Sequence, residues 1–289
     1  YQPKKVEAAR NFCNKVYNAS RFVMMNLGDG ELQPVDMSIT DIADKWILHR
    51  LNEVAEAVTA NLDSFDLNLA VDKIYSFIWT EFCDWYIEMA KPRLYGDDEA
   101  QKANVRAILV HVLKNSMKLL HPFMPFITET IWQALPHEGP SVMVSSWPEY
   151  DEKLNFSVEE AQMESLMDAV RAIRNRRAEM NVPPSKKAKV LILTEKKDTF
   201  SAGAGFFPKL AYASEIELID AVPADAAKMA SVVTGDAQIY MPMGDLIDFE
   251  AERARLGKEK SKVEADIDFV MKKLNNPKFV DKAPEKVVA

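Results

Sequence analysis

The stretch NFCNKVYNASRFV, residues 11–23, lies within a predicted helix over residues 6–27, and it sets the interpretation of the whole chain. At about 100° per residue, two stripes of side chains run along this helix about a quarter turn apart. The apolar stripe consists of Phe12, Val16, Ala19 and Val23, and the polar stripe consists of Asn11, Lys15, Asn18 and Phe22. The apolar stripe predicts packing against a core, which leaves the polar stripe near the surface.

The polar stripe differs from an ordinary solvent-facing side of a helix, where Lys and Glu are the common residues. Asparagine reads base edges, Lys15 and the nearby Arg21 neutralise phosphate, and an exposed Phe22 offers a surface to an unpaired base. The pattern therefore fits RNA binding. It fits equally well an ordinary capped helix in which Phe22 joins the core and the asparagines bond to neighbouring loops.

The chain of 289 residues is long enough for about two domains with their own cores. With 48% hydrophobic and 28% charged residues, its composition is that of a soluble globular protein. No apolar run has transmembrane length and the first residues are polar, so we expect a cytoplasmic protein without membrane contact. Cys13 and Cys83 are isolated and have no histidine at metal-ligand spacing, so no metal site and no disulfide is predicted.

The net charge of −8 argues against a protein that coats nucleic acid indiscriminately, but it permits local basic surfaces. The densest positive segment, residues 171–189, contains a single acidic residue, Glu179. Such a run is commonly a solvated face of a helix. If it contacts RNA instead, the candidates for backbone contacts are Arg171, Arg174 and Arg177.

Hydrophobic periodicity and helix-start residues predict four more helices, over residues 41–62, 66–89, 98–120 and 125–135. Mostly short loops join these helices to one another and to the first, which is typical of a bundle. The helix over 66–89 is rich in aromatic side chains, which favours coverage by several neighbours. The helix over 41–62 is expected to have a polar face of Asp44, Lys45, Arg50, Glu53 and Glu56. The helical domain is predicted to occupy residues 1–148.

Residues 149–244 are predicted to form a small α/β domain, which follows a short extended piece at residues 142–147. Its predicted elements are a helix over 157–180 with the basic run, a strand over 189–194, a helix over 200–213, a strand over 215–219, and a hairpin of residues 231–233 and 238–240.

Residues 245–289 have the heptad pattern of a coiled coil. The residues that recur every seven positions are Phe249, Leu256, Val263 and Val270. The pattern breaks at residues 275–277, and only the entry to a return helix follows, which suggests that the chain is cut from something larger. The predicted fold is therefore mainly α, with a five-helix bundle, a small α/β domain and a C-terminal coiled-coil helix.

Motifs of catalysis are missing from this sequence. It contains no Gly-rich phosphate loop, no nucleophile elbow, no zinc-protease motif and no paired Cys and His. The carboxylates Glu81, Asp84 and Glu88 share one helix face and are most simply its solvated side. We therefore predict a binding chain with no catalytic residue and no cofactor of its own.

Several segments resemble one family. Residues 10–23 (RNFCNKVYNASRFV), 81–94 (EFCDWYIEMAKPRL) and 119–132 (LLHPFMPFITETIW) resemble the anticodon-binding helical domain of bacterial valyl-tRNA synthetases. Residues 171–185 (RAIRNRRAEMNVPPS) are similar to the connecting helix that follows that domain, and the tail from residue 249 is similar to the family's coiled-coil arm. These segments occur in the family's order.

This resemblance implies a part of a class I enzyme that joins valine to its tRNA with ATP and edits mischarged threonine. The ATP-site signatures and the editing domain do not occur here, so the chain alone is expected to be inactive. The implied partners are the valine isoacceptor of tRNA and the missing N-terminal catalytic and editing domains, which use the ATP. The parent enzyme is expected to be monomeric.

The resemblance also implies a site. By position in the matching segments, the anticodon-side contacts are Lys15, Asn18 and Phe22, with Asn11, Asn14 and Arg21 as further candidates. Lys91 and Arg93 are expected to meet phosphates. The return helix of the family's arm is nearly absent from this sequence.

Two alternatives stay open. An isoleucyl-type relative would be expected to end in a zinc-binding cysteine cluster, whereas Cys13 and Cys83 lie far from the C-terminus. A helical interaction module without enzymatic function would use residues 11–22 to contact protein and its coiled coil to dimerise. The salt dependence of binding distinguishes an RNA-binding chain from a protein-interaction module, because binding that neutralises several phosphates weakens strongly as the salt concentration rises.

Overall fold

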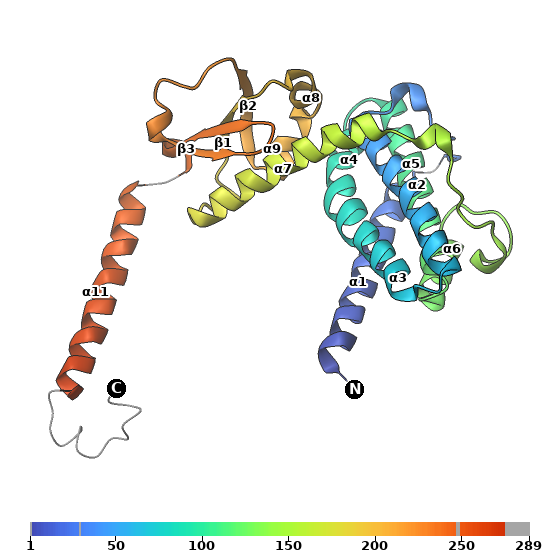
Figure 1. Cartoon of the computed structure of the whole chain (residues 1–289), viewed down its shortest axis with the longest axis horizontal. Coiled ribbons are helices and arrows are strands. Elements are labelled where there is room, and N and C mark those ends of the chain that lie inside the picture. The colour runs from blue at the N-terminus through green and yellow to red at the C-terminus, as the bar shows by residue number, and fades with distance from the viewer. Residues whose placement is uncertain (1, 29, 247–248, 275–289) are drawn as a thin grey trace.

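The computed structural model describes residues 2–28, 30–246 and 249–274, and it contains a helical bundle, a small sheet and a long separate helix (Figure 1). The bundle elements are α1 (Pro3–Met25), α2 (Ile42–Asp63), α3 (Leu67–Ser76), a π-helical segment (Phe77–Tyr86), α4 (Ile87–Leu94), α5 (Glu99–Leu120) and α6 (Pro125–Ala134). The later elements are α7 (Ser157–Glu179), β1 (Ala188–Leu193), α8 (Lys197–Ala202), α9 (Phe207–Leu210), β2 (Ala213–Ile219), β3 (Met229–Val233), β4 (Gln238–Pro242), α10 (Met243–Leu246) and α11 (Phe249–Leu274). The predicted class, a mainly helical chain with a small α/β part, is confirmed.

The first helix packs as its pattern predicts. The apolar stripe of α1 is buried, and it contacts the π-helical segment, α5 and α6. Pro3 starts the helix, where the missing N–H costs nothing and the fixed φ favours the first turn. Residues 2–11 are nevertheless all exposed, so the core fixes α1 only from Phe12 onward.

The segment from α3 to α4 forms one continuous rod, which we name the α3–α4 rod (residues 67–94). A single α-helix over 66–89 was predicted, whereas the middle of the rod, Phe77–Tyr86, is π-helical. The rod also continues through Pro92 to Leu94, because a proline near the end of a helix removes only one backbone hydrogen bond. The widened π turns bury Phe77, Ile78, Phe82, Trp85 and Tyr86.

The sheet has the strand order β2-β1-β4-β3. Strands β1 and β2 are parallel, while β4 is antiparallel to both β1 and β3, and the predicted hairpin between β3 and β4 is confirmed. The predicted helix over 200–213 is wrong in its extent: the connection starts at Lys197, breaks near Gly203 and ends at Leu210. The extended piece predicted at 142–147 is also wrong, because Val142–Val144 forms a 3-10 turn.

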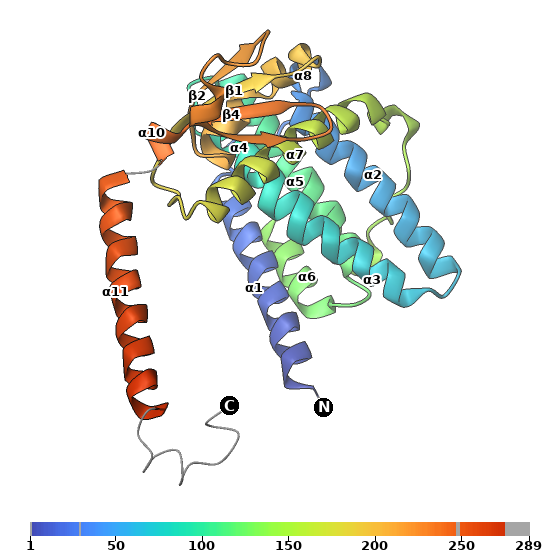
Figure 2. The same cartoon turned by 60° about the vertical axis from the view of Figure 1, so that its left-hand side comes forward.

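Helix α7 lies against α2 of the bundle and against β3 of the sheet, so it links the two parts. Helix α11 stands apart from both in two views of the molecule (Figures 1 and 2). Its seam residues Val263, Ile267 and Val270 are exposed, and the predicted return helix lies outside the described residues. Pairing of α11 in a coiled coil therefore stays a prediction. Among the described residues, no helix combines the length and the apolar content that crossing a bilayer requires.

Candidate nucleic-acid interface

The polar stripe of α1 lies at the surface of the bundle. Asn11, Asn14, Asn18 and Arg21 are exposed, whereas Lys15 and Phe22 are half-buried. The Phe22 ring packs against the core and still keeps an accessible part, so its predicted contact with RNA stays a prediction. No described segment covers the exposed amides.

The α3–α4 rod lies beside this stripe along its length, and α1 and the rod run parallel. Phe12 lies beside Tyr75, Lys15 pairs with Asp84, and Phe22 lies beside Lys91. Lys15 and Lys91 were chosen from separate parts of the sequence, and the fold brings them to the same border. The candidate interface therefore consists of one face of α1 and the adjacent edge of the rod.

Lys15 occupies the centre of this border. Its Nζ lies 2.5 Å from Oδ1 of Asp84 and 4.0 Å from the centre of the Trp79 ring. The Asp84 side chain is half-exposed, and exposed ion pairs contribute only about 0.2–1 kcal/mol. Exchange of this carboxylate for an RNA phosphate therefore costs little free energy.

Lys91 and Phe22 form the other end of the border. The Lys91 ammonium lies 5.4 Å from the centre of the Phe22 ring and also pairs with Glu88. Glu88, Asp84 and Glu81 each pair with a cation, the last with Arg50; Asp84 is exposed as predicted, whereas Glu81 and Glu88 are half-buried. The positive charge of Lys91 beside an aromatic ring suits a stacked nucleotide and its phosphate.

Arg93 has a different environment from Lys91. Its Nη1 and Nη2 donate to the two carboxylate oxygens of Asp44 over 2.5 and 2.8 Å, and Asp41 lies 3.2 Å from its Nε. Asp44 was assigned to the polar face of α2, but its side chain is fully buried. The reason is that the Tyr86 hydroxyl and Arg93, both remote in sequence, satisfy its oxygens. Arg93 thus holds α2 to α4, which corrects its expected role as a phosphate contact.

This buried cluster shifts the acid–base equilibria of its members. Burial, together with the charge of Asp44, raises the pKa of Asp41 to about 6. Burial also raises the pKa of Tyr86 well above its usual value, and the Asp44 carboxylate adds to this shift. Both directions are those expected for acids removed from water.

The basic run of α7 divides into two groups. Arg171 and Arg174 are exposed and lie 5.2 and 5.9 Å from the centre of the Trp85 ring. Arg177 is buried and donates to the backbone carbonyls of Pro183 and Lys186. The expectation that Arg177 contacts an RNA backbone is therefore corrected: it fixes the turn after α7. Arg171 and Arg174 remain candidates.

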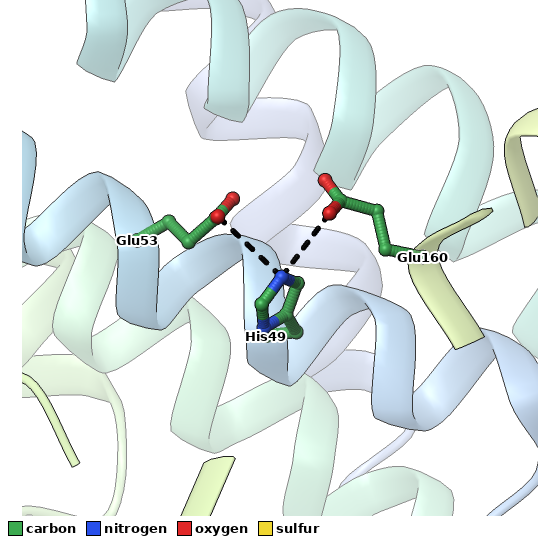
Figure 3. A group of neighbouring side chains, drawn as sticks. All are labelled: His49, Glu53 and Glu160. Atoms are coloured by element: carbon green, nitrogen blue, oxygen red, sulfur yellow. Dashed lines mark hydrogen bonds and ion pairs between the residues drawn. The ribbon is translucent and has the colours of Figure 1, made fainter. Parts of the chain in front are cut away.

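A histidine and two glutamates also come together, between α2 and α7 (Figure 3). Nε2 of His49 lies 3.2 Å from Glu160 and 3.5 Å from Glu53. The His49 Nδ1 accepts the backbone N–H of Phe156 over 3.1 Å, so Nε2 carries the proton of the neutral ring and donates it to Glu160. A metal ion needs a free lone pair at Nε2, and this tautomer does not offer one.

Arg50 supplies the charge that balances these carboxylates. Its guanidinium contacts Glu53, Glu81 and Glu160, and these partners raise its pKa against the opposing effect of burial. The whole cluster, His49 included, therefore joins α2, the π-helical segment and α7 by hydrogen bonds and ion pairs.

Sequence reasoning missed two aromatic residues at the border of the interface. Tyr75 is 40% exposed and Trp79 is half-buried, although we expected the aromatics of this helix to be covered. The positions of Tyr75 and Trp79 relative to the apolar stripe of the helix could have predicted their exposure. Each follows a buried isoleucine, Ile74 or Ile78, and so lies about 100° off the buried stripe.

Two known families match parts of this sequence. The family described as "Anticodon-binding domain of tRNA ligase" matches residues 44–192, about half of the chain. The family described as "Valyl tRNA synthetase tRNA binding arm" matches residues 248–289. Helix α1 and its polar stripe precede the first of these matches.

Curated proteins named valine--tRNA ligase are similar over the whole chain, including α1. Those of Clostridium acetobutylicum and Clostridium perfringens are 49% and 50% identical over 292 residues, which cover 100% of this chain and 33% of each relative. That of Oceanobacillus iheyensis is 45% identical over 289 residues, covering 99% of this chain and 33% of the relative. The chain spans about a third of the length of these relatives.

Proposed function

The chain belongs to the family of tRNA-ligase anticodon-binding domains, and we propose that it is the tRNA-binding part of a valine–tRNA ligase. In this role, the exposed side of α1 receives unpaired nucleotides of the anticodon loop. The observation that carries the proposal is the polar face of α1, where the amides of Asn11, Asn14 and Asn18 are open to solvent beside the half-buried Lys15 and Phe22. The similarity to valine–tRNA ligases extends over this helix.

Each residue of the interface has a matching chemical task. The amides of Asn11, Asn14 and Asn18 both donate and accept hydrogen bonds, as base edges require. Lys15 and Arg21 neutralise phosphates, and the accessible part of the Phe22 ring stacks on a base. Lys91 extends the positive charge along the border. Arg171 and Arg174 provide further backbone contacts on the side of α7.

The remaining parts of the proposal concern the longer enzyme. The partner is the valine isoacceptor of tRNA, and α11 contacts the tRNA body, which the match of this segment to a valyl-tRNA synthetase tRNA-binding arm supports. ATP-dependent ligation takes place on a separate catalytic domain of a monomeric parent enzyme in the cytoplasm. The similarity to valine–tRNA ligases that are about three times as long supports this division of labour.

A titration of the chain with a fluorescent RNA stem-loop that carries a valine anticodon tests the proposal. We expect the affinity to fall at least tenfold when the anticodon is substituted, because base contacts and not only phosphates contribute. We also expect a plot of the logarithm of the affinity against the logarithm of the salt concentration to fall linearly. Its slope should be about −0.7 for each phosphate of a single strand that the protein neutralises.

Other outcomes would reject the proposal. Equal affinity for the native and the substituted loops would remove anticodon recognition from this chain. Preference for an isoleucine anticodon would favour the isoleucyl-type relative. Absence of RNA binding at low salt would favour a protein-interaction module.

A further inference from the structure

We propose that Tyr75 and Trp79 form a stacking platform for an additional unpaired base of the RNA, beside the polar stripe of α1. The inference rests on the proposed function, because it adds a base contact to the same surface. It concerns a different element, the α3–α4 rod, and two residues that were not candidates from the sequence.

The rings of Tyr75 and Trp79 lie nearly parallel, and a third ring, that of Phe12, packs against them. The centres of the Tyr75 and Trp79 rings are 5.6 Å apart with an angle of 14° between the planes, which is an offset stack. Phe12 of α1, itself only 5% exposed, lies 4.7 Å from Tyr75 and 6.5 Å from Trp79. The buried Phe12 ring therefore packs against the pair and leaves Tyr75 40% exposed.

Lys15 joins this pair to the polar stripe. Its ammonium lies 4.0 Å from the centre of the Trp79 ring, close enough for a cation–π interaction. The same ammonium is our candidate for a phosphate contact, so a nucleotide whose phosphate reaches Lys15 has its base near the two rings. Rings beside a cation along the path of the backbone are the usual arrangement in single-strand RNA sites.

Two features distinguish the pair from ordinary core packing. The Tyr75 hydroxyl has no hydrogen-bond partner among the described residues, so no internal bond explains a tyrosine here. The π-helical segment begins at Phe77, between the two rings. Such segments are rare and occur frequently at functional sites. A leucine at position 75 would cover Phe12 equally well, and this provides the test.

The experiment compares Tyr75→Leu with Tyr75→Phe in the stem-loop titration described above. The leucine variant keeps the apolar cover of Phe12 but lacks a π face, and we expect it to bind about 5- to 150-fold more weakly. The phenylalanine variant keeps the ring and is expected to bind within twofold of the original chain. Phe126→Leu is the matched control, because Phe126 is an 87% exposed aromatic on α6, and it should not change the affinity.

A series of stem-loops, each lacking one base of the loop, identifies the contact. With the original chain, removal of the stacked base should weaken binding, and with Tyr75→Leu that single removal should have no further effect. A merely structural role would instead lower the affinity for every member of the series by the same factor, and that result would overturn the inference.

The failure of this inference differs from the failure of the proposed function. If the original chain recognises the anticodon but Tyr75→Leu binds as tightly, only the platform is rejected. If the original chain does not discriminate between anticodons, the interface is rejected together with the platform.

Discussion

At the scale of single residues, Lys15 connects the parts of the interface, because its ammonium contacts both Asp84 and the Trp79 ring. We expect Lys15→Ala to weaken stem-loop binding and to reduce the slope of the salt dependence by about 0.7, the share of one phosphate. Asp84→Asn should instead strengthen stem-loop binding, because it removes the carboxylate that pairs with Lys15. Titrations at several salt concentrations measure both, and an unchanged slope in Lys15→Ala would show that this residue meets no phosphate.

Phe22 differs from Lys15, because part of its ring belongs to the core. We expect Phe22→Ala to weaken stem-loop binding by about 1–3 kcal/mol through lost stacking. Phe22→Leu is the control for packing, because it retains most of the apolar volume while removing the π face. Calorimetric titration with both variants checks this. Full affinity in Phe22→Leu would mean that the ring contributes packing alone.

Asp41 predicts a pH effect on stability. Its pKa is raised from 3.8 to about 6 in the folded protein, so the folded state favours the protonated acid. The stability from this group is fully present below its unfolded pKa and is lost as the pH rises through about 6. Asp41→Asn retains an acceptor for the N–H of Asp44 but cannot ionise.

The free energy of unfolding of Asp41→Asn should therefore fall less between pH 4 and pH 7 than that of the original chain. Urea denaturation at several pH values measures the difference between the two proteins. Identical pH profiles would show that Asp41 titrates normally.

Some of these residue assignments were accessible from sequence and others were not. Helical geometry alone placed Asn11, Asn18 and Lys15 at the surface of α1. The expectations for Asp44, Arg93 and Arg177 failed, because partners that are remote in the chain or belong to a turn bury Asp44 and Arg177 and half-bury Arg93. A charged side chain is buried only with such partners, and the pattern of a single helix does not contain them.

At the scale of elements, the break between α8 and α9 has a packing cause that predicts a large mutational effect. A Cβ added at Gly203 would lie 2.3 Å from Cδ1 of Leu166, a side chain of α7 that is only 1% exposed. We expect Gly203→Ala to destabilise the chain by about 1–3 kcal/mol, the usual cost of an overpacked core.

Gly205→Ala is the matched control, because no atom lies within 4 Å of its added Cβ. Urea denaturation of the two variants measures the difference. Equal stability of both would mean that α7 and α8 pack less closely than described here.

The elements themselves were largely predictable where periodicity was strong. The helices over 41–62 and 98–120 agree closely with α2 and α5, since long apolar stripes and capping residues mark their ends. The π-helical segment was not predicted, because its i→i+5 bonds follow from the packing of Phe77, Phe82 and their neighbours and not from a local residue preference. The Gly203 break was equally hidden, since the obstructing side chain lies on α7.

At the scale of the whole molecule, a net charge of −8 is compatible with RNA binding because charge is distributed unevenly. The acids nearest the interface are paired: Asp84 with Lys15, and Glu88 with Lys91. On the other side of the π-helical segment, Arg171 and Arg174 of α7 lie over Trp85. Cations from two distant parts of the chain thus flank one segment of the rod, a placement that only the folded chain reveals.

The most direct measurement is photo-crosslinking of the chain to anticodon stem-loops that carry a thiouridine at one loop position, followed by mass spectrometry of the linked peptides. The interface described here predicts adducts within residues 11–22 and at the adjoining edge of the rod, residues 75–91. Adducts confined to the sheet or to α5 and α6, with none on α1, would contradict it.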